Sequence, residues 1–142
     1  MLNPEAAKDR AEDLVARARR AGADDADAVY LANASESVQV RLGKLEDVER
    51  SESEHMLLRV FVGKRSASIG SSDLSTAALD ELAGRAVDMA RAAPGDAYAG
   101  LAPAELLMRS GFPDLDLDDP DEPTPQSLRA DADAAEDAAR AV

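Results

Sequence analysis

The sequence predicts an α+β fold, and three observations lead to that prediction. A helical period runs through residues 4–21, and strand-like alternation follows over residues 27–71. A second helical period begins after Asp73. Short polar breaks separate the alternating runs, which is typical of an antiparallel meander of about five strands. We therefore expect an N-terminal helix, this meander, a helix packed on one face of the sheet, an acidic linker and a C-terminal helix.

The first helix has sequence signals at both ends. Asn3 can cap it, Pro4 suits the first helical position, and Gly22 suits the residue after the last turn. One face is apolar at helical spacing and consists of Ala7, Ala11, Leu14, Val15 and Ala18. Charged residues occupy the opposite face, so the helix packs on another element.

Five runs in the middle of the chain predict the strands. They read "DAVYLAN", "SVQVRLG", "KLEDVERSES", "HMLLRVFVG" and "RSASIGS". The second and fourth alternate clearly between apolar and polar residues, as half-buried strands do. In the third, Leu45 and Val48 are out of phase, which is compatible with a β-bulge.

The helix after the meander also has start and stop signals. Ser75 is the expected cap, and Leu74 and Leu79 have the spacing of a hydrophobic staple. Pro94-Gly95 ends the run. The apolar face comprises Leu79, Leu82, Ala83, Ala86, Val87 and Ala90.

Composition changes after this helix and sets the expected domain boundaries. We assign residues 1–110 to an N-terminal α+β domain and residues 111–123, rich in proline and aspartate, to a linker. Residues 124–142 are expected to form a helix that leads to a C-terminal domain absent from this chain.

The last helix has a clear start but a weak apolar face. Thr124 is the expected cap and Pro125 the first helical residue. Leu128 and Val142 are its only large apolar residues, so its helix propensity exceeds its ability to pack. We therefore expect the natural chain to continue beyond Val142.

Charge and composition argue against several classes of protein. A net charge of −13 disfavours binding to nucleic acid or to an anionic membrane surface. The chain has no cysteine, which excludes disulfides, cysteine-based zinc sites and a thiol nucleophile. No apolar run approaches the roughly 18 residues that span a bilayer, and the N-terminus has no secretory signal pattern. We expect a cytoplasmic protein.

The stretch "RSASIGSSDLS", residues 65–75, has the small and hydroxyl residues of a phosphate-binding loop or a nucleophile site. Gly63-Lys64-Arg65 lacks both the earlier glycine and the following hydroxyl residue of a P-loop. Ser66, Ser68 and Ser71 lack the flanking glycines of a nucleophile elbow and a nearby histidine base. We interpret the stretch as a strand followed by a helix cap.

His55, the only histidine, lies beside Glu54. Neighbouring strand residues point to opposite faces, so the two side chains would not converge on one site. We interpret His55 as a solvent-facing residue in a turn or at a strand start.

Asp114, Asp116 and Asp118 have the spacing of a calcium-binding EF-hand loop. Asp119 stands where that loop needs glycine, and Pro125 stands where it needs a bidentate glutamate. A solvated acidic linker is the better interpretation. We assign no catalytic, cofactor-binding or metal-binding residue to this chain.

Four segments occur together in one order: "RLGKLEDVERSES", "LLRVFVGKRSASIGSSDLS", "DAYAGLA" and "PDLDLDDP". In this order they make the sequence resemble the N-terminal region of the TldD/PmbA family, metallopeptidases also called modulators of DNA gyrase. The segment before the second helix resembles the "G-x-A-S-x-x-D-L-S" pattern of the PmbA (TldE) branch. Ser66 replaces its glycine, and the matching positions are Ala67, Ser68, Ser72, Asp73, Leu74 and Ser75. "SESEH" at 51–55 departs from the family, whose members tend to have an Asp-Gly-like turn there.

The resemblance implies a role in a larger assembly. Family members have a second, β-rich domain, and TldD-type and PmbA-type subunits pair in a zinc metallopeptidase whose zinc lies on the TldD-type subunit. It therefore implies a scaffolding and substrate-handling domain with no cofactor of its own. Its expected partners are a TldD-like subunit or a second copy, and an unfolded peptide.

Two alternatives remain open. A stand-alone acidic module could bind a basic protein through the run from Asp114 to Glu122. An enzyme with an unrecognised carboxylate site would need a base or metal ligands that the residue inventory does not supply.

Overall fold

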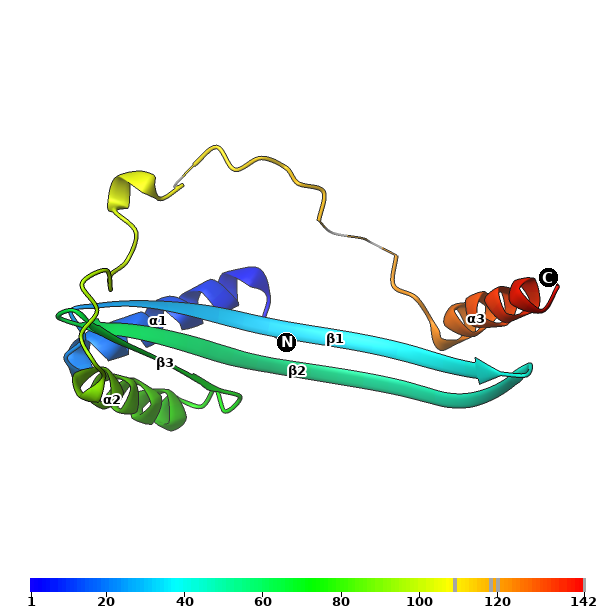
Figure 1. Cartoon of the computed structure of the whole chain (residues 1–142), viewed down its shortest axis with the longest axis horizontal. Coiled ribbons are helices and arrows are strands. Elements are labelled where there is room, and N and C mark those ends of the chain that lie inside the picture. Colours follow the sequence, from blue (N-terminus) through cyan, green and yellow to red (C-terminus); the bar gives the residue numbers. More distant parts are fainter. Residues whose placement is uncertain (109, 118, 120, 142) are drawn as a thin grey trace. The chain divides into compact units, whose positions relative to one another are not determined.

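The computed structural model describes residues 1–108, 110–117, 119 and 121–141. Asp118 and Val142, which bear on the predictions above, lie outside these residues. The elements in chain order are α1 (Pro4–Ala21), β1 (Asp25–Arg41), β2 (Lys44–Val62), β3 (Arg65–Ser71), α2 (Thr76–Ala92), a 3-10 helix η1 (Ala104–Leu106) and α3 (Pro125–Arg140) (Figure 1). In the described residues, no helix combines the length and the apolar character needed to cross a bilayer.

The helices begin where their sequence signals predict. The Asn3 side chain accepts a hydrogen bond from the Ala6 N–H at 2.8 Å, and Ser75 caps α2 by accepting from a backbone N–H in the first turn. Thr124 caps α3 in a reciprocal arrangement with the side chain three residues later. Gly22 ends α1 in the left-handed region at φ 108°, where a residue without Cβ avoids a steric penalty.

The prediction of about five strands is wrong, because the sheet in the described residues has three strands in the order β1-β2-β3. "DAVYLAN" and "SVQVRLG" both belong to β1, and "KLEDVERSES" and "HMLLRVFVG" both belong to β2. A strand continues wherever its backbone is paired, and solvent-facing positions accept polar side chains. Polar residues between apolar runs are therefore not breaks in this sheet.

Two tight turns connect the strands. Leu42 and Gly43 have φ of 54° and 70°, which is the left-handed geometry of two-residue hairpin turns. Gly63, at φ 58°, opens the turn between β2 and β3. Residues 51–55, where family members tend to have a turn, lie within the continuous strand β2.

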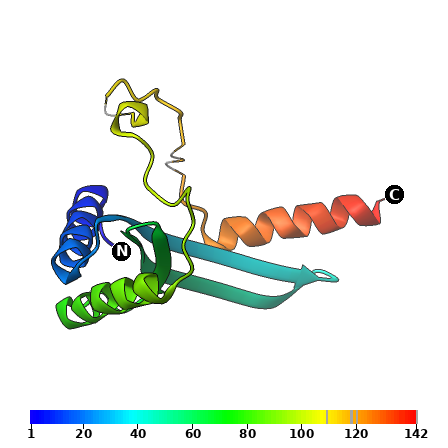
Figure 2. The same cartoon turned by 60° about the vertical axis from the view of Figure 1, so that its left-hand side comes forward.

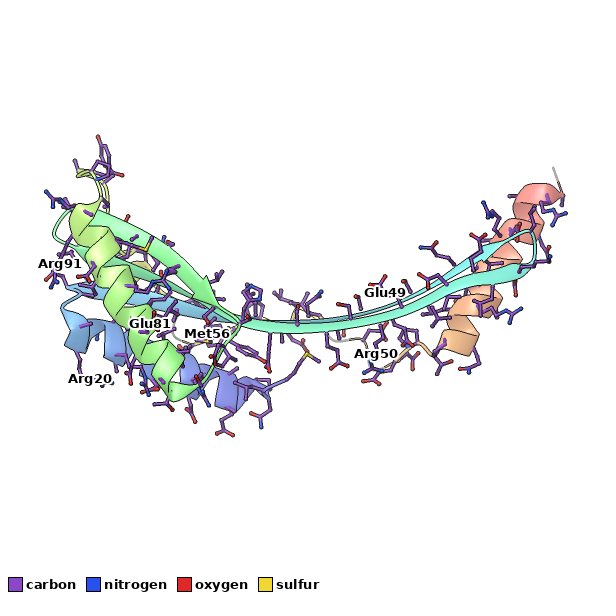
Figure 3. The ribbon with its side chains drawn as sticks, turned by 90° about the horizontal axis from the view of Figure 1, so that it is seen from below. Arg20, Glu49, Arg50, Met56, Glu81 and Arg91 are labelled. Carbon is purple, nitrogen blue, oxygen red and sulfur yellow. The ribbon has the colours of Figure 1, made fainter. Side chains whose placement is uncertain are left out.

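The chain divides into two units. The core unit comprises residues 1–32 and 53–107, and the hairpin-end unit comprises residues 33–52 and 108–142. In the core unit, α1 and α2 cover the same face of the sheet and lie side by side (Figures 2 and 3). The Arg17 guanidinium of α1 joins the two helices, because it pairs with Asp80 of α2 at 2.5 Å. It also pairs with Asp13 of its own helix at 2.8 Å.

The hydrophobic core lies between these helices and the sheet. In the antiparallel pairing of β2 with β3, Leu58 is opposite Ile69 and Val60 is opposite Ala67, so alternate residues face the helices. The largest fully buried side chains are Leu14, Met56, Leu58, Leu79, Val60 and Val87. The core is aliphatic, as the low aromatic content predicts.

The hairpin-end unit contains the turn of the β1–β2 hairpin and α3. None of its described residues is buried. Glu49 and Arg50, both labelled in Figure 3, are exposed. The Glu136 carboxylate of α3 accepts hydrogen bonds from the backbone N–H groups of Leu42 at 2.6 Å and Gly43 at 2.8 Å. A polar contact, rather than buried apolar area, therefore joins α3 to the turn.

Candidate functional site

The serine-rich stretch forms the strand and helix cap predicted from its sequence. Ser66 and Ser68 lie on β3 opposite Phe61 and Arg59 of β2. The Ser71 hydroxyl is used locally, since it donates to the Asp73 carbonyl and accepts from the Asp73 N–H, both at 3.0 Å. The stretch thus has a full structural role as a strand end and a cap.

His55 lies in the interior of β2 rather than in a turn or at a strand start, because β2 is continuous from Lys44. It is half-buried. The Glu54 carboxylate instead accepts a hydrogen bond at 2.5 Å from the Tyr30 hydroxyl, which also accepts from the Leu2 N–H at 3.0 Å. This hydrogen bond to Glu54 raises the pKa of Tyr30. Since strand neighbours alternate in direction, His55 faces away from this network.

The acidic segment shows local turns rather than a convergent site. The Asp116 N–H donates to the Asp114 carboxylate at 3.1 Å, and Asp116 has φ 47°. Among the residues that the structure describes, no three or more His, Cys, Asp or Glu side chains gather as metal ligands would. With one histidine and no cysteine, this chain's own donors do not fit a zinc centre.

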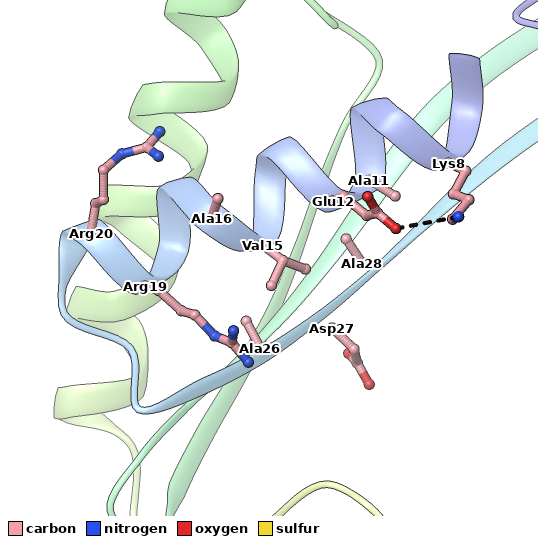
Figure 4. A pocket seen from close by; sticks show the side chains of 10 residues that line it. All are labelled: Lys8, Ala11, Glu12, Val15, Ala16, Arg19, Arg20, Ala26, Asp27 and Ala28. Atoms are coloured by element: carbon pink, nitrogen blue, oxygen red, sulfur yellow. Dashed lines mark ion pairs between the residues drawn. The ribbon is translucent and has the colours of Figure 1, made fainter. Parts of the chain in front are cut away.

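A groove of about 760 Å³ lies between α1 and β1 in the core unit (Figure 4). Its apolar part is built from small side chains, and its rim is charged. The apolar residues are Ala11, Val15, Ala16, Ala26 and Ala28, and the charged residues are Lys8, Glu12, Arg19, Arg20 and Asp27. Because alanines form most of its apolar part, the space is not filled by this chain's own side chains.

The strand beside this groove is an outer strand of the sheet. β1 is paired with β2 on one side, and in the order β1-β2-β3 no strand of the described residues lies on its other side. An outer strand presents backbone N–H and C=O groups that another extended segment can pair with. The groove and the free strand edge therefore lie together on the core unit.

A second cavity, of about 580 Å³, lies on the core unit at the face away from the helices. It is lined by Asp25, Asp27 and Arg59 together with Leu101, Ala102, Ala104 and Leu107. Arg59 forms an ion pair with Asp27, and its guanidinium lies 5.3 Å from the centre of the Phe61 ring. This pair has a structural explanation, since the Arg59 guanidinium lies over the ring of Phe61, which is 5% exposed.

The sequence analysis did not find the groove. Ala11 and Val15, which line the groove, were placed on the core face of α1, but sequence spacing does not show how closely that helix packs on the outer strand. The alternation of Ala26 and Ala28 on β1 was the available signal. Small residues at inward positions of an outer strand leave unfilled space beneath a covering helix.

Comparison with known proteins places the fold in a family. Residues 26–90 match the family model described as PmbA/TldA metallopeptidase domain 1. The chain belongs to the TldD/PmbA family. The matched residues run from the start of β1 to the last turn of α2, so they include the strand edge and one wall of the groove.

Two known proteins are similar to this chain, one in sequence and one in fold. Metalloprotease PmbA of Escherichia coli O157:H7 is 38% identical over 103 residues, which cover 72% of this chain and 23% of that protein. A crystal structure of a protein from Bacteroides thetaiotaomicron VPI-5482, described as a modulator of DNA gyrase, has a TM-score of 0.71. The match covers 80% of this chain and 25% of the Bacteroides chain. The identity is 21%, so the match shows a shared fold. The chain thus spans about a quarter of the length of each of these two proteins.

Proposed function

We propose that this chain is the N-terminal scaffolding and substrate-handling domain of a PmbA-like (TldE-type) subunit, and that it holds extended peptides along the outer edge of β1. The observation that carries the proposal is the unpaired edge of β1 next to an open groove. The match to the first domain of a metallopeptidase family supports a role in handling peptides.

Strand addition suits a substrate that has no fixed structure. An added strand is held mainly by main-chain hydrogen bonds, which do not depend on the peptide's sequence. A folded protein has few unpaired extended segments, so an edge of this kind favours unfolded peptides over native proteins.

In this proposal the cleavage chemistry belongs to a TldD-like partner subunit, which would carry the zinc. This chain positions the peptide and contributes surface to the assembly. Metalloprotease PmbA, with which it shares 38% identity, is named for proteolysis, so the parent of this chain is proposed to act in a peptidase of the same kind.

The test of peptide holding uses the purified 142-residue chain and fluorescent extended peptides. We expect unfolded peptides to bind and raise the fluorescence anisotropy. N-methylation of alternate backbone nitrogens should abolish binding, because those positions can no longer donate to the edge of β1. Equal binding of methylated and unmethylated peptides, or no binding by any peptide, would contradict strand addition.

The partner proposal needs a separate measurement. We expect the 142-residue chain to co-purify with a TldD-like subunit, and the joint preparation to cleave peptides. A chain that remains unassociated in the presence of that subunit would rule out the pairing.

A further inference from the structure

We infer that the groove between α1 and β1 selects extended peptides that have large apolar side chains at alternate positions. The preferred peptide also carries an acidic group at the end that lies near the C-terminus of α1. The inference rests on the proposed strand addition and names the substrate class of that same site. The family match gives no such preference.

The geometry of a β-strand fixes which peptide side chains would enter the groove. On β1, Ala26 and Ala28 point to the helix face, and Ala26 is only 5% exposed. A strand added beside β1 sends every second side chain to this same face, at intervals of roughly 6.5–7 Å. Those side chains would lie beneath α1, next to Val15 and Ala16, which line the groove in Figure 4.

The small size of the lining residues decides which side chains fit. Alanine contributes one methyl group, so the groove of about 760 Å³ offers apolar walls and unfilled space. Large aliphatic side chains such as leucine would fill that space and lose contact with water, whereas serine would do neither. The groove is therefore complementary to a peptide with alternating large apolar residues.

The charged residues on the rim of the groove decide which charge is favoured at one end of the bound peptide. Lys8 is paired with Glu12 at 3.7 Å, and Arg19 is paired with Asp25 at 3.6 Å. Arg20 also lines the groove, and it has no ion pair among the residues that the structure describes. On a chain of net charge −13, an unneutralised cation at the groove end provides charge complementarity to a carboxylate.

The experiment compares three peptides of equal length on the purified 142-residue chain. The first alternates leucine with polar residues and ends in aspartate, the second has serine in place of leucine, and the third ends in lysine. We expect the leucine peptide to bind at least about tenfold more tightly than the serine peptide, because several apolar side chains become buried. The lysine-ended peptide should bind several-fold more weakly, with a difference that shrinks at high salt.

Two pairs of variants connect these preferences to the groove. Ala16→Phe places a ring in the groove from an exposed position of α1, and Ala77→Phe adds the same ring to an exposed position of α2. We expect only Ala16→Phe to remove the preference for leucine. Arg20→Glu should remove the preference for the acidic end, whereas Arg85→Glu, on α2, should not. Circular dichroism and the thermal midpoint check that each variant is folded.

The outcomes separate this inference from the function on which it rests. If unmethylated peptides bind but leucine and serine peptides bind equally, strand addition stands and groove selection is wrong. If no peptide binds, both fail. If the chain forms dimers that Ala16→Phe dissociates, a second copy occupies the groove and the peptide inference is overturned.

Discussion

β2 passes through both units of the molecule, and its two halves differ in burial and in residue type, since residues 44–52 are mostly polar and residues 56–62 mostly apolar. In the core unit, Met56, Leu58 and Val60 are fully buried. In the hairpin-end unit, Leu45 and Val48 of the same strand are 44% and 46% exposed. Both halves are paired β-structure, so pairing alone does not create a core. The difference comes from the side chains of each half and from α1 and α2, which pack on the core half.

The helices of the two units have different side chains. α2 presents Leu79, Leu82 and Val87 to the core unit, and each is at least 97% buried. The part of α3 that the structure describes has Leu128 as its only large apolar residue, and the remaining apolar positions are alanines. A two-stranded hairpin without an apolar cover is marginally stable in water. The core unit is therefore expected to supply the cooperative stability of the chain.

The largest effect should distinguish two leucines of β2. We expect Leu58→Ala to lower the free energy of unfolding by about 2–5 kcal/mol, because it leaves a cavity in the core unit. Leu45→Ala, in the hairpin-end unit, should change it by less than about 1 kcal/mol. Urea unfolding followed by circular dichroism measures both. Equal losses would show that the hairpin-end unit contributes a core of its own.

Two glycines at similar backbone angles provide a smaller test. A Cβ at Gly43 or Gly63 would meet no atom within 4 Å, so Gly→Ala at either site adds backbone strain alone. That strain is about 1–2 kcal/mol for a left-handed residue. We expect Gly63→Ala to lower the thermal midpoint, since its turn joins two strands of the core unit. Gly43→Ala should leave the thermal midpoint nearly unchanged. If it lowered the midpoint as much as Gly63→Ala does, both turns would belong to one cooperative unit.

The smallest effect should appear on acidification. The N–H of Gly43, and to a lesser degree that of Leu42, lowers the pKa of Glu136. A lowered pKa means that the contact stabilises the hairpin-end unit above the usual glutamate value, about 4.3. The contribution is lost as the pH falls through the lower pKa of the folded state.

Amide chemical shifts of Leu42 and Gly43 measure this change directly. We expect both to move as the pH falls below about 4, and to stop responding in Glu136→Gln. Glu81→Gln, an exposed change on α2, is the matched control and should leave the titration intact. A Leu42 amide that titrates unchanged in Glu136→Gln would rule out the contact.

Local signals predicted the helices well and the strands only in part. Asn3, Ser75 and Thr124 cap the three α-helices as predicted, because capping depends on residues within one turn. The five-strand prediction was wrong because polar runs around Ser35 and Ser51 were taken as breaks. Whether such a run is a loop or an exposed length of strand depends on its partner strand, which lies elsewhere in the sequence.

The sequence by itself determined the helix caps, the alternation in "HMLLRVFVG", the family resemblance and the shortage of nitrogen and sulfur ligands. Each of these depends on residue type and short-range spacing. Only the tertiary structure decided that the sheet of the described residues has three strands with β1 at its edge, and that a groove lies between α1 and β1. These features depend on which distant segments pair and pack against one another, and long-range contacts rather than any local pattern decide that.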